Sequence, residues 1–118
     1  MKIVRQDIER AKPNTSPIMV GEVVSQNLVA EGDAPSLRVT AVTFRDGAVN
    51  RWHTHSTEQV LVVTDGEGMV ATETEERAIT VGDVVLIEPG EKHWHGAAPG
   101  RAMTHLSILI PGEMTIVE

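Results

Sequence analysis

Apolar and polar residues alternate in short stretches along most of the chain, and turns that contain Gly or Pro separate these stretches. Turn signals such as Asp46-Gly47, Asp65-Gly66 and Pro89-Gly90 recur about every 8–12 residues, a spacing typical of β-sandwiches and barrels. The alternation predicts strands over residues 37–44, 50–55, 59–64, 68–74, 77–81, 83–87, 92–98 and 102–110. We therefore expect an all-β fold.

The N-terminal part of the chain has a weaker pattern. Residues 3–5 and 22–30 are candidates for edge strands, and residues 6–11 for one helical turn. Sheet edges need cover, and the segment 1–30 is apolar enough at Ile3, Val4, Ile18 and Val20 to pair with a partner subunit. We expect a homodimer or a higher even homo-oligomer.

Composition limits the classes of protein that fit. The chain has 118 residues and 12.8 kDa, which suits one domain, residues 1–118. Its formal net charge of −7 and the lack of a basic block make nucleic acid and anionic membranes poor partners. The chain contains no Cys and no Tyr, so any acid–base catalysis must use His, Asp, Glu, Lys or a metal-bound water. No signal-peptide pattern or membrane-length apolar run is present, so we expect a cytoplasmic location.

The histidines carry the strongest chemical signal. Four of the five form two His-x-His pairs, His53/His55 and His93/His95. In a strand, residues i and i+2 point to the same face, so each pair projects two imidazoles to one side. Two such strands side by side would bring four imidazoles together. Imidazole is a ligand for Zn, Cu, Fe, Ni and Co, and sites without thiolate are commonly catalytic.

Two motifs around these pairs resemble those of the cupin family. The first consists of Gly47, His53, His55, Gln59 and Gly66, with Gln where Glu is usual. The second consists of Gly82, Glu88, Gly90, His93 and Ala97, with Glu88 where Pro is usual and Ala97 where Asn is usual. The resemblance covers about residues 37–110 and implies a double-stranded β-helix, or jelly-roll barrel, that binds a small molecule.

The resemblance also implies a metal site. The family's ligand positions fall on His53, His55, Gln59 and His93. Surrounding stretches, including 89–97 and 103–106, resemble bacterial manganese cupins with hydroxynitrile lyase activity. This implies one divalent transition metal per chain, with Mn favoured and Fe, Ni, Co or Zn as alternatives. The segment Ser56-Thr57-Glu58 departs from that group, which commonly carries Pro or Gly there.

The anionic ligand position has an alternative candidate. Glu58 could serve if the strand bulges at Gln59, but strand alternation places Gln59 on the face of Leu61 and Val63. A Gln ligand leaves a divalent metal with its full +2 charge, whereas Glu would reduce it to +1. The Gln site should therefore be the stronger Lewis acid, which favours acid–base over redox chemistry.

His95 and His105 remain outside this ligand set. They are candidates for catalytic acid–base residues, or alternatively for groups that orient a ligand imidazole. Thr40 and Val42 are candidates for the substrate pocket, although core packing explains Val42 equally well. The expected function is a metal-dependent lyase of the hydroxynitrile lyase type, with the metal as Lewis acid. The alternatives are a metal-dependent dioxygenase and a non-catalytic small-molecule-binding cupin.

Overall fold

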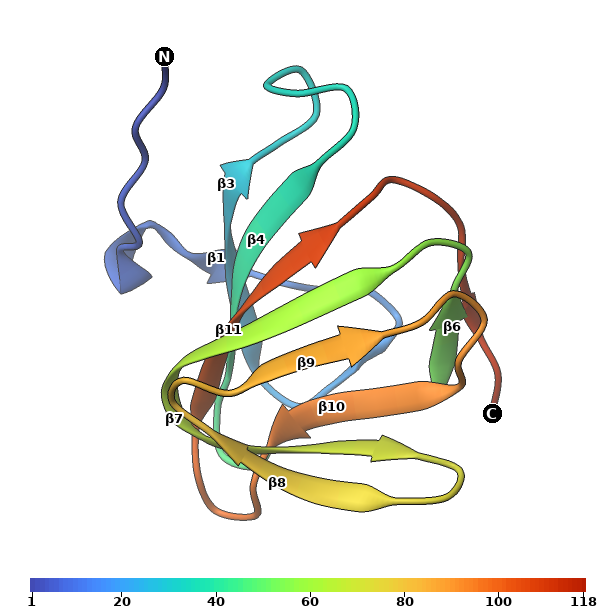
Figure 1. Cartoon of the computed structure of the whole chain (residues 1–118). Helices are drawn as coiled ribbons and strands as arrows, with labels where there is room; N and C mark the ends of the chain where they lie inside the picture. The colour runs from blue at the N-terminus through green and yellow to red at the C-terminus, as the bar shows by residue number, and fades with distance from the viewer.

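Strands make up nearly all of the regular structure, as the alternation predicted. The computed structural model describes residues 1–118 and contains twelve strands and one 3-10 helix (Figure 1). The elements are η1 (Ile8–Arg10), β1 (Lys12–Pro13), β2 (Met19–Val20), β3 (Val23–Val29), β4 (Arg38–Phe44), β5 (Val49–Asn50), β6 (His53–His55), β7 (Gln59–Thr72), β8 (Glu76–Thr80), β9 (Val84–Ile87), β10 (His93–Ala97), β11 (Met103–Leu109) and β12 (Met114–Ile116). No helix is long and apolar enough to cross a membrane.

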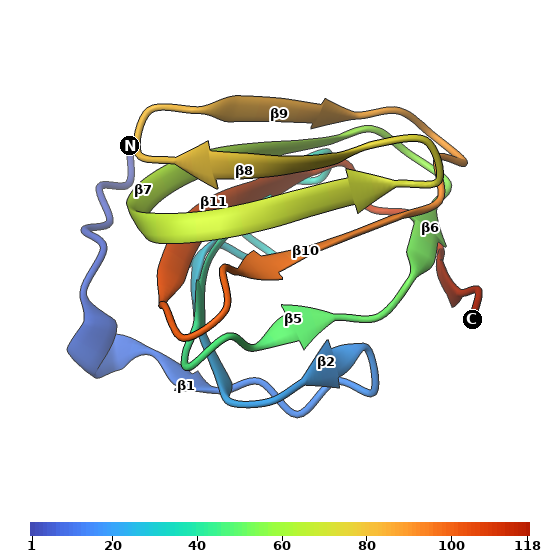
Figure 2. The same ribbon diagram turned by 90° about the horizontal axis from the view of Figure 1, so that it is seen from below.

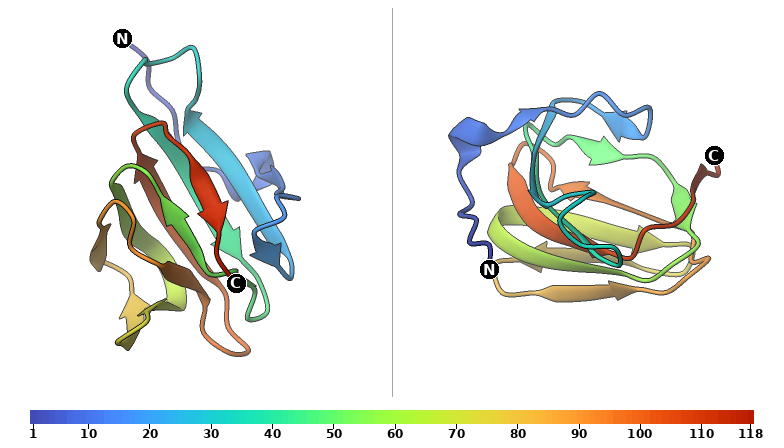
Figure 3. Two further views of the ribbon diagram at one scale, coloured as in Figure 1. Left: turned by 90° about the vertical axis from the view of Figure 1, so that its right-hand side faces the viewer. Right: turned by 90° about the horizontal axis from the view of Figure 1, so that it is seen from above.

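The strands form two sheets that curl around a common interior (Figures 2 and 3). Sheet A has the order β1-β3-β4-β11-β7-β9, and sheet B contains β2, β5, β10, β7 and β8, with β6 between β10 and β12. All pairings are antiparallel. Strand β7 belongs to both sheets, because its first half pairs with β11 and its second half with β10.

This continuity of β7 corrects one prediction. Asp65-Gly66 was expected to end a strand, yet the chain bends there and continues to Thr72. Gly66 has a φ of 76°, in the left-handed region, and the register with β11 shifts between Thr104 and His105. The turn signal therefore marks the corner at which the strand passes from one sheet to the other.

Other boundaries also differ from the expectation. The strand predicted over 50–55 is interrupted at residues 51 and 52, where the Arg51 carbonyl accepts a hydrogen bond from the His53 ring. Residues 3–5 form no strand, and the predicted helical turn is η1, in which Asp7 accepts a hydrogen bond from the Glu9 amide. Strands β1, β2 and β12 were not predicted.

Gly66→Ala should lower the unfolding midpoint by about 10 °C, which for a chain of this size is roughly 3 kcal/mol. A Cβ at Gly66 would overlap the Ala102 carbonyl oxygen, and the φ of 76° strains any other residue. At Gly100 the φ is 70° but nothing lies within 4 Å of the added Cβ. Gly100→Ala should therefore cost only about 1 kcal/mol. If urea denaturation showed the same decrease in the free energy of unfolding for both variants, this explanation would be contradicted.

The interior is divided between an apolar core and the histidines. Ten buried side chains form the core: Val23, Val42, Phe44, Ala48, Val63, Val70, Ile79, Ile87, Ala97 and Met103. All five histidines are buried as well. Phe44 joins the two regions, since its ring centroid lies 5.9 Å from that of His95 and 5.4 Å from that of His105.

Candidate metal centre

Three imidazoles converge where β6 meets β10. His53 and His93 are directly opposite each other in this antiparallel pair, and His55 follows on the same face of β6. The ligand nitrogens of His53, His55 and His93 all lie within 4.8 Å of one another. The shared inner face that the alternation predicted and the pairing of β6 with β10 together bring three of the four paired imidazoles to one place.

Backbone carbonyls fix the orientation of two of these rings. The Nδ1 of His53 donates to the Arg51 carbonyl at 2.7 Å, and the Nδ1 of His93 donates to the Glu91 carbonyl at 2.8 Å. A carbonyl can only accept, so each Nδ1 carries the proton and each Nε2 keeps its lone pair. In both strands the carbonyl lies two residues before the histidine, so the same local geometry is used twice.

The Gln59 amide is oriented in a similar way. Its Nε2 donates to the Ser107 hydroxyl at 2.9 Å, which leaves its Oε1 as the free end. Gln59 is 5 % exposed and lies on the inner face of β7, whereas Glu58 is exposed. Strand alternation thus holds at this position, and the geometry supports Gln59 rather than Glu58 as the fourth donor.

The unpartnered buried atoms fit a bound cation. The Nε2 atoms of His55 and His93 and the Oε1 of Gln59 are buried without a hydrogen-bond partner. Buried polar atoms are rarely left unpaired, and all of these are lone-pair donors of the kind that binds a divalent transition metal. His53, His55, Gln59 and His93 are therefore a suitable ligand set.

Burial keeps these histidines in the neutral form that binds metal. Burial, with a smaller contribution from the neighbouring His93, lowers the pKa of His53 and of His55 to about 4. The pKa of His93 is also lowered by burial, against the opposing effect of its hydrogen bond to the Glu91 carbonyl. At neutral pH all three imidazoles are uncharged, so no proton competes for their ligand nitrogens.

The metal-free protein should lose stability steeply as the pH falls from about 6.5 towards 4. Burial lowers the pKa of His53, His55 and His105 to about 4, whereas the ordinary value is 6.5. Between these values the unfolded chain binds more protons than the folded chain. The contribution of the buried, neutral histidines to the free energy of unfolding is therefore complete above pH 6.5, and it is lost as the pH falls towards 4. The prediction is checked by measuring the thermal unfolding midpoint between about pH 6.5 and 4 in the presence of a chelator. A midpoint that stays constant over this range would contradict it.

His95 and His105 form a hydrogen-bonded pair beside the three imidazoles. The His105 Nε2 lies 3.0 Å from the His95 Nδ1. The His95 ring centroid is 5.8 Å from those of His53 and His93 and 4.8 Å from that of His105. Burial lowers the pKa of His105 to about 4 and that of His95 well below its ordinary value. Both rings are neutral at pH 7, and each has one nitrogen that can accept a proton.

The two predicted pocket residues lie on the inner face of β4. Val42 is opposite His105 and Thr40 is opposite Ser107 in the pairing of β4 with β11. Val42 is 6 % exposed and belongs to the apolar core, whereas Thr40 is half-buried. Both residues are therefore next to the strand that carries His105.

Two further residues contact the site and were not singled out from the sequence. Asn50 is buried, accepts a hydrogen bond from the His95 amide at 2.9 Å, and places its Nδ2 3.2 Å from the His95 Nε2. Ser107 holds the Gln59 amide. Ser107 could have been found, because it shares a strand face with His105, but no local signal marks Asn50.

Comparison with known proteins is consistent with this architecture. The structure resembles a cupin-like protein from Thermotoga maritima, with a TM-score of 0.86 and 35% identity over 95% of this chain and 89% of that chain. It also resembles the polyketide cyclase RemF from Streptomyces resistomycificus, with a TM-score of 0.81 and 17% identity over 99% of this chain and 88% of that chain. At that identity the second likeness shows the fold alone.

The sequence comparisons identify the family. The chain is 42% identical over 111 residues to an (R)-mandelonitrile lyase from Granulicella tundricola, which covers 92% of this chain and 83% of that protein. Residues 40–110 match the Cupin domain family, close to the predicted boundaries of 37–110. The fold, the site and these matches agree: the chain belongs to the cupin family.

Proposed function

We propose that this chain is a metal-dependent lyase that cleaves cyanohydrins of the mandelonitrile type. The observation that carries the proposal is the His95–His105 pair beside the three convergent imidazoles, 3.0 Å from nitrogen to nitrogen. It offers a proton acceptor next to a place where a substrate hydroxyl can be bound. The 42% identity to a protein named (R)-mandelonitrile lyase supports the substrate class.

His53, His55, Gln59 and His93 would hold one divalent transition metal, with manganese favoured by the family resemblance. When bound, the cation supplies Lewis acidity that lowers the pKa of a coordinated hydroxyl. Iron, nickel, cobalt or zinc could occupy the same donors, because imidazole affinity follows the Irving–Williams order rather than the native preference.

The histidine pair would move the proton of the reaction. His95 accepts the proton of the substrate hydroxyl while the bond between the carbinol carbon and the cyano group breaks. Cyanide leaves with the electron pair of that bond and takes up a proton, so the products are an aldehyde and hydrogen cyanide. Because both rings are neutral, His105 can share the added proton through its Nε2. Thr40 and Val42 would border the substrate from β4.

Release of benzaldehyde from mandelonitrile, measured with and without oxygen, tests this function. Turnover at equal rates in both conditions, lost after chelation and restored by manganese, is the expected result. Oxygen consumption with a diketone or flavonol, and no cleavage of any cyanohydrin, would instead identify a dioxygenase. Metal binding without turnover of either substrate class would identify a binding protein.

A further inference from the structure

Strand β6 carries two of the three convergent imidazoles but has few contacts on its β10 side. It is three residues long and pairs with β10 only where His53 lies opposite His93. The Gly90 amide, from the turn before β10, also donates to the His55 carbonyl at 2.8 Å. A strand this short is stable only when its neighbours hold it. The position of the two ligand imidazoles therefore depends on what lies along the other edge of β6.

That edge is occupied by the C-terminal segment, residues 110–117, which we name the strap (Figures 1 and 2). Within the strap, β12 lies opposite the whole of β6. The pairing continues beyond one end of β6, since the Ser56 amide donates to the Glu113 carbonyl at 2.9 Å. It continues beyond the other end as well, where the Val117 amide donates to the Trp52 carbonyl at 3.0 Å. The strap is therefore the longest partner that β6 has.

Two hydroxyl groups fasten the strap just after β6. The Ser56 Oγ accepts a hydrogen bond from the Glu113 amide at 2.8 Å, and the Thr57 Oγ1 donates to the Ile110 carbonyl at 2.6 Å. The contact is close at Gly112, where an added Cβ would lie 2.5 Å from the Ser56 Oγ. We name Ser56 and Thr57 the clasp. Pro or Gly, which the cupins that this sequence resembles commonly carry in this segment, has no hydroxyl and could form neither bond.

Little apolar contact holds the strap besides these hydrogen bonds. All three residues of β12 are exposed, and the exposed fraction is 43% for Met114 and 39% for Ile116. Strand β12 pairs with no strand other than β6. Segments with few buried contacts and exposed hydrogen bonds are those that open most readily. The attachment of the strap thus depends on a small number of hydrogen bonds, two of which come from the clasp.

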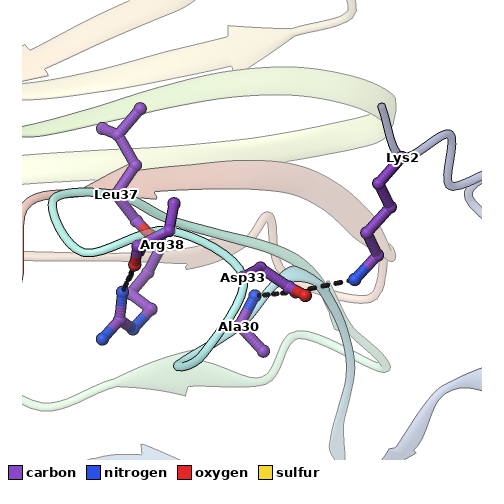
Figure 4. Close-up of polar contacts among 6 residues, drawn as sticks. Lys2, Ala30, Asp33, Leu37 and Arg38 are labelled. Atoms are coloured by element: carbon purple, nitrogen blue, oxygen red, sulfur yellow. Dashed lines mark hydrogen bonds and ion pairs between the residues drawn. The ribbon is translucent and has the colours of Figure 1, made fainter.

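The other long connection at this end of sheet A is held differently. Leu109 lies opposite Arg38, so the β11–β12 and β3–β4 connections leave the sheet at the same end. In the β3–β4 connection, Asp33 accepts hydrogen bonds from the Ala30 amide at 2.8 Å and from Lys2 at 2.7 Å (Figure 4). Arg38 donates to two backbone carbonyls of the same connection. None of these contacts involves a strand that carries a metal ligand, so of the two connections only the strap supports the site.

We propose that the clasp positions the ligands on β6 through the strap, and that a bound metal and the docked strap stabilise each other. The inference rests on the metal site of the proposed function but not on the lyase reaction. When the strap detaches, β6 keeps only its contacts on the β10 side, so His53 and His55 are no longer held at the spacing that one cation requires. Coupling between two sites is reciprocal, so the metal should also slow the opening of the strap.

Transfer of manganese from the loaded full chain to an excess of a coloured chelator tests this role of the clasp. Thr57→Val should release the metal about fivefold faster than wild type, which is the effect of one ordinary hydrogen bond, and Ser56→Ala combined with Thr57→Val about 30-fold faster. Both variants should still bind about one manganese ion per chain at saturation. Thr57→Ser keeps the hydroxyl and should release the metal at the wild-type rate. Thr54→Val is the matched control, because Thr54 lies on β6 but is not part of the clasp.

Hydrogen exchange of the wild-type chain is a second test that needs no substitution. Mass spectrometry of the C-terminal peptide, residues 110–118, should show exchange at least about fivefold slower with manganese bound than in the metal-free protein. A peptide that contains the Arg45 amide, which donates to the Glu22 carbonyl away from the site, should exchange at the same rate in both states.

Other results would overturn the proposal. A double variant that releases manganese at the wild-type rate, or a C-terminal peptide that exchanges equally with and without metal, would show that the strap and the site are independent. Equal acceleration in Thr54→Val would show that the effect does not belong to the clasp. If the double variant does not fold by circular dichroism, Gly112→Val, which pushes the strap away from the clasp, should give the same faster release. Wild-type chain that binds no manganese would instead remove the metal site itself, and this inference with it.

Discussion

Replacing His93 with Ala should reduce the bound metal from about one ion per chain to less than about a tenth, and should abolish cyanohydrin cleavage. His93 is fully buried, its Nε2 has no hydrogen-bond partner, and its Nδ1 is held by the Glu91 carbonyl. Its Nε2 is therefore held as a free donor, and the substitution removes one of the four proposed ligands. Elemental analysis of desalted protein, together with benzaldehyde release, measures both effects.

Glu58→Gln provides the matched control for this prediction. Glu58 is exposed and precedes Gln59, so its substitution should leave the metal content unchanged. Gln59→Ala should lower the metal content, because it removes the Oε1 that lies buried without a partner. Loss of metal from Glu58→Gln with retention in Gln59→Ala would show that the strand is shifted and that Glu58 is the ligand.

His105→Gln should lower the turnover number by about 10²–10⁴ while the metal content stays near one ion per chain. The substituted amide fills a similar volume and can still hydrogen-bond to His95, but it cannot accept a proton. The contact that matters is the 3.0 Å approach of the His105 Nε2 to the His95 Nδ1. Steady-state kinetics with mandelonitrile and elemental analysis of the same sample give the two quantities.

The competing role for His105 predicts a different result. If His105 only orients the neighbouring imidazoles, the variant should bind metal about 10–100-fold more weakly and recover full turnover at saturating metal. Thr104→Ala is a suitable control, because Thr104 lies on the same strand but points to the outer face, where it hydrogen-bonds to Thr43. That variant should keep both its metal and its turnover.

Local periodicity predicted that the two histidines of each pair share one face, and the family resemblance indicated which of them are ligands. The ligand nitrogens of His53, His55 and His93 lie within 4.8 Å of one another because these residues share the inner face and β6 pairs with β10. The same rule placed Gln59 inside and Glu58 outside. These predictions depend only on which face of a strand each side chain occupies. Within a strand of three to five residues, that face follows directly from the sequence.

Features that depend on contacts between distant residues were not predictable in this way. Asp65-Gly66 has the residues of a tight turn, and only the pairing of β7 with β11 and then β10 makes it a corner within one strand. The Gln59 amide is oriented by Ser107, and His95 by Asn50, across 48 and 45 residues of sequence. Ile18 was expected at a subunit interface, but it is 5% exposed and packs within its own chain.

Titration of manganese into metal-free protein, with anaerobic benzaldehyde release from mandelonitrile as the readout, tests the central claim most directly. The proposed donors His53, His55, Gln59 and His93 would make one site per chain. Turnover should therefore rise linearly with added manganese and level off at about one equivalent per chain. Turnover that is already complete in the metal-free protein, or that is absent once an equivalent has bound, would contradict the account.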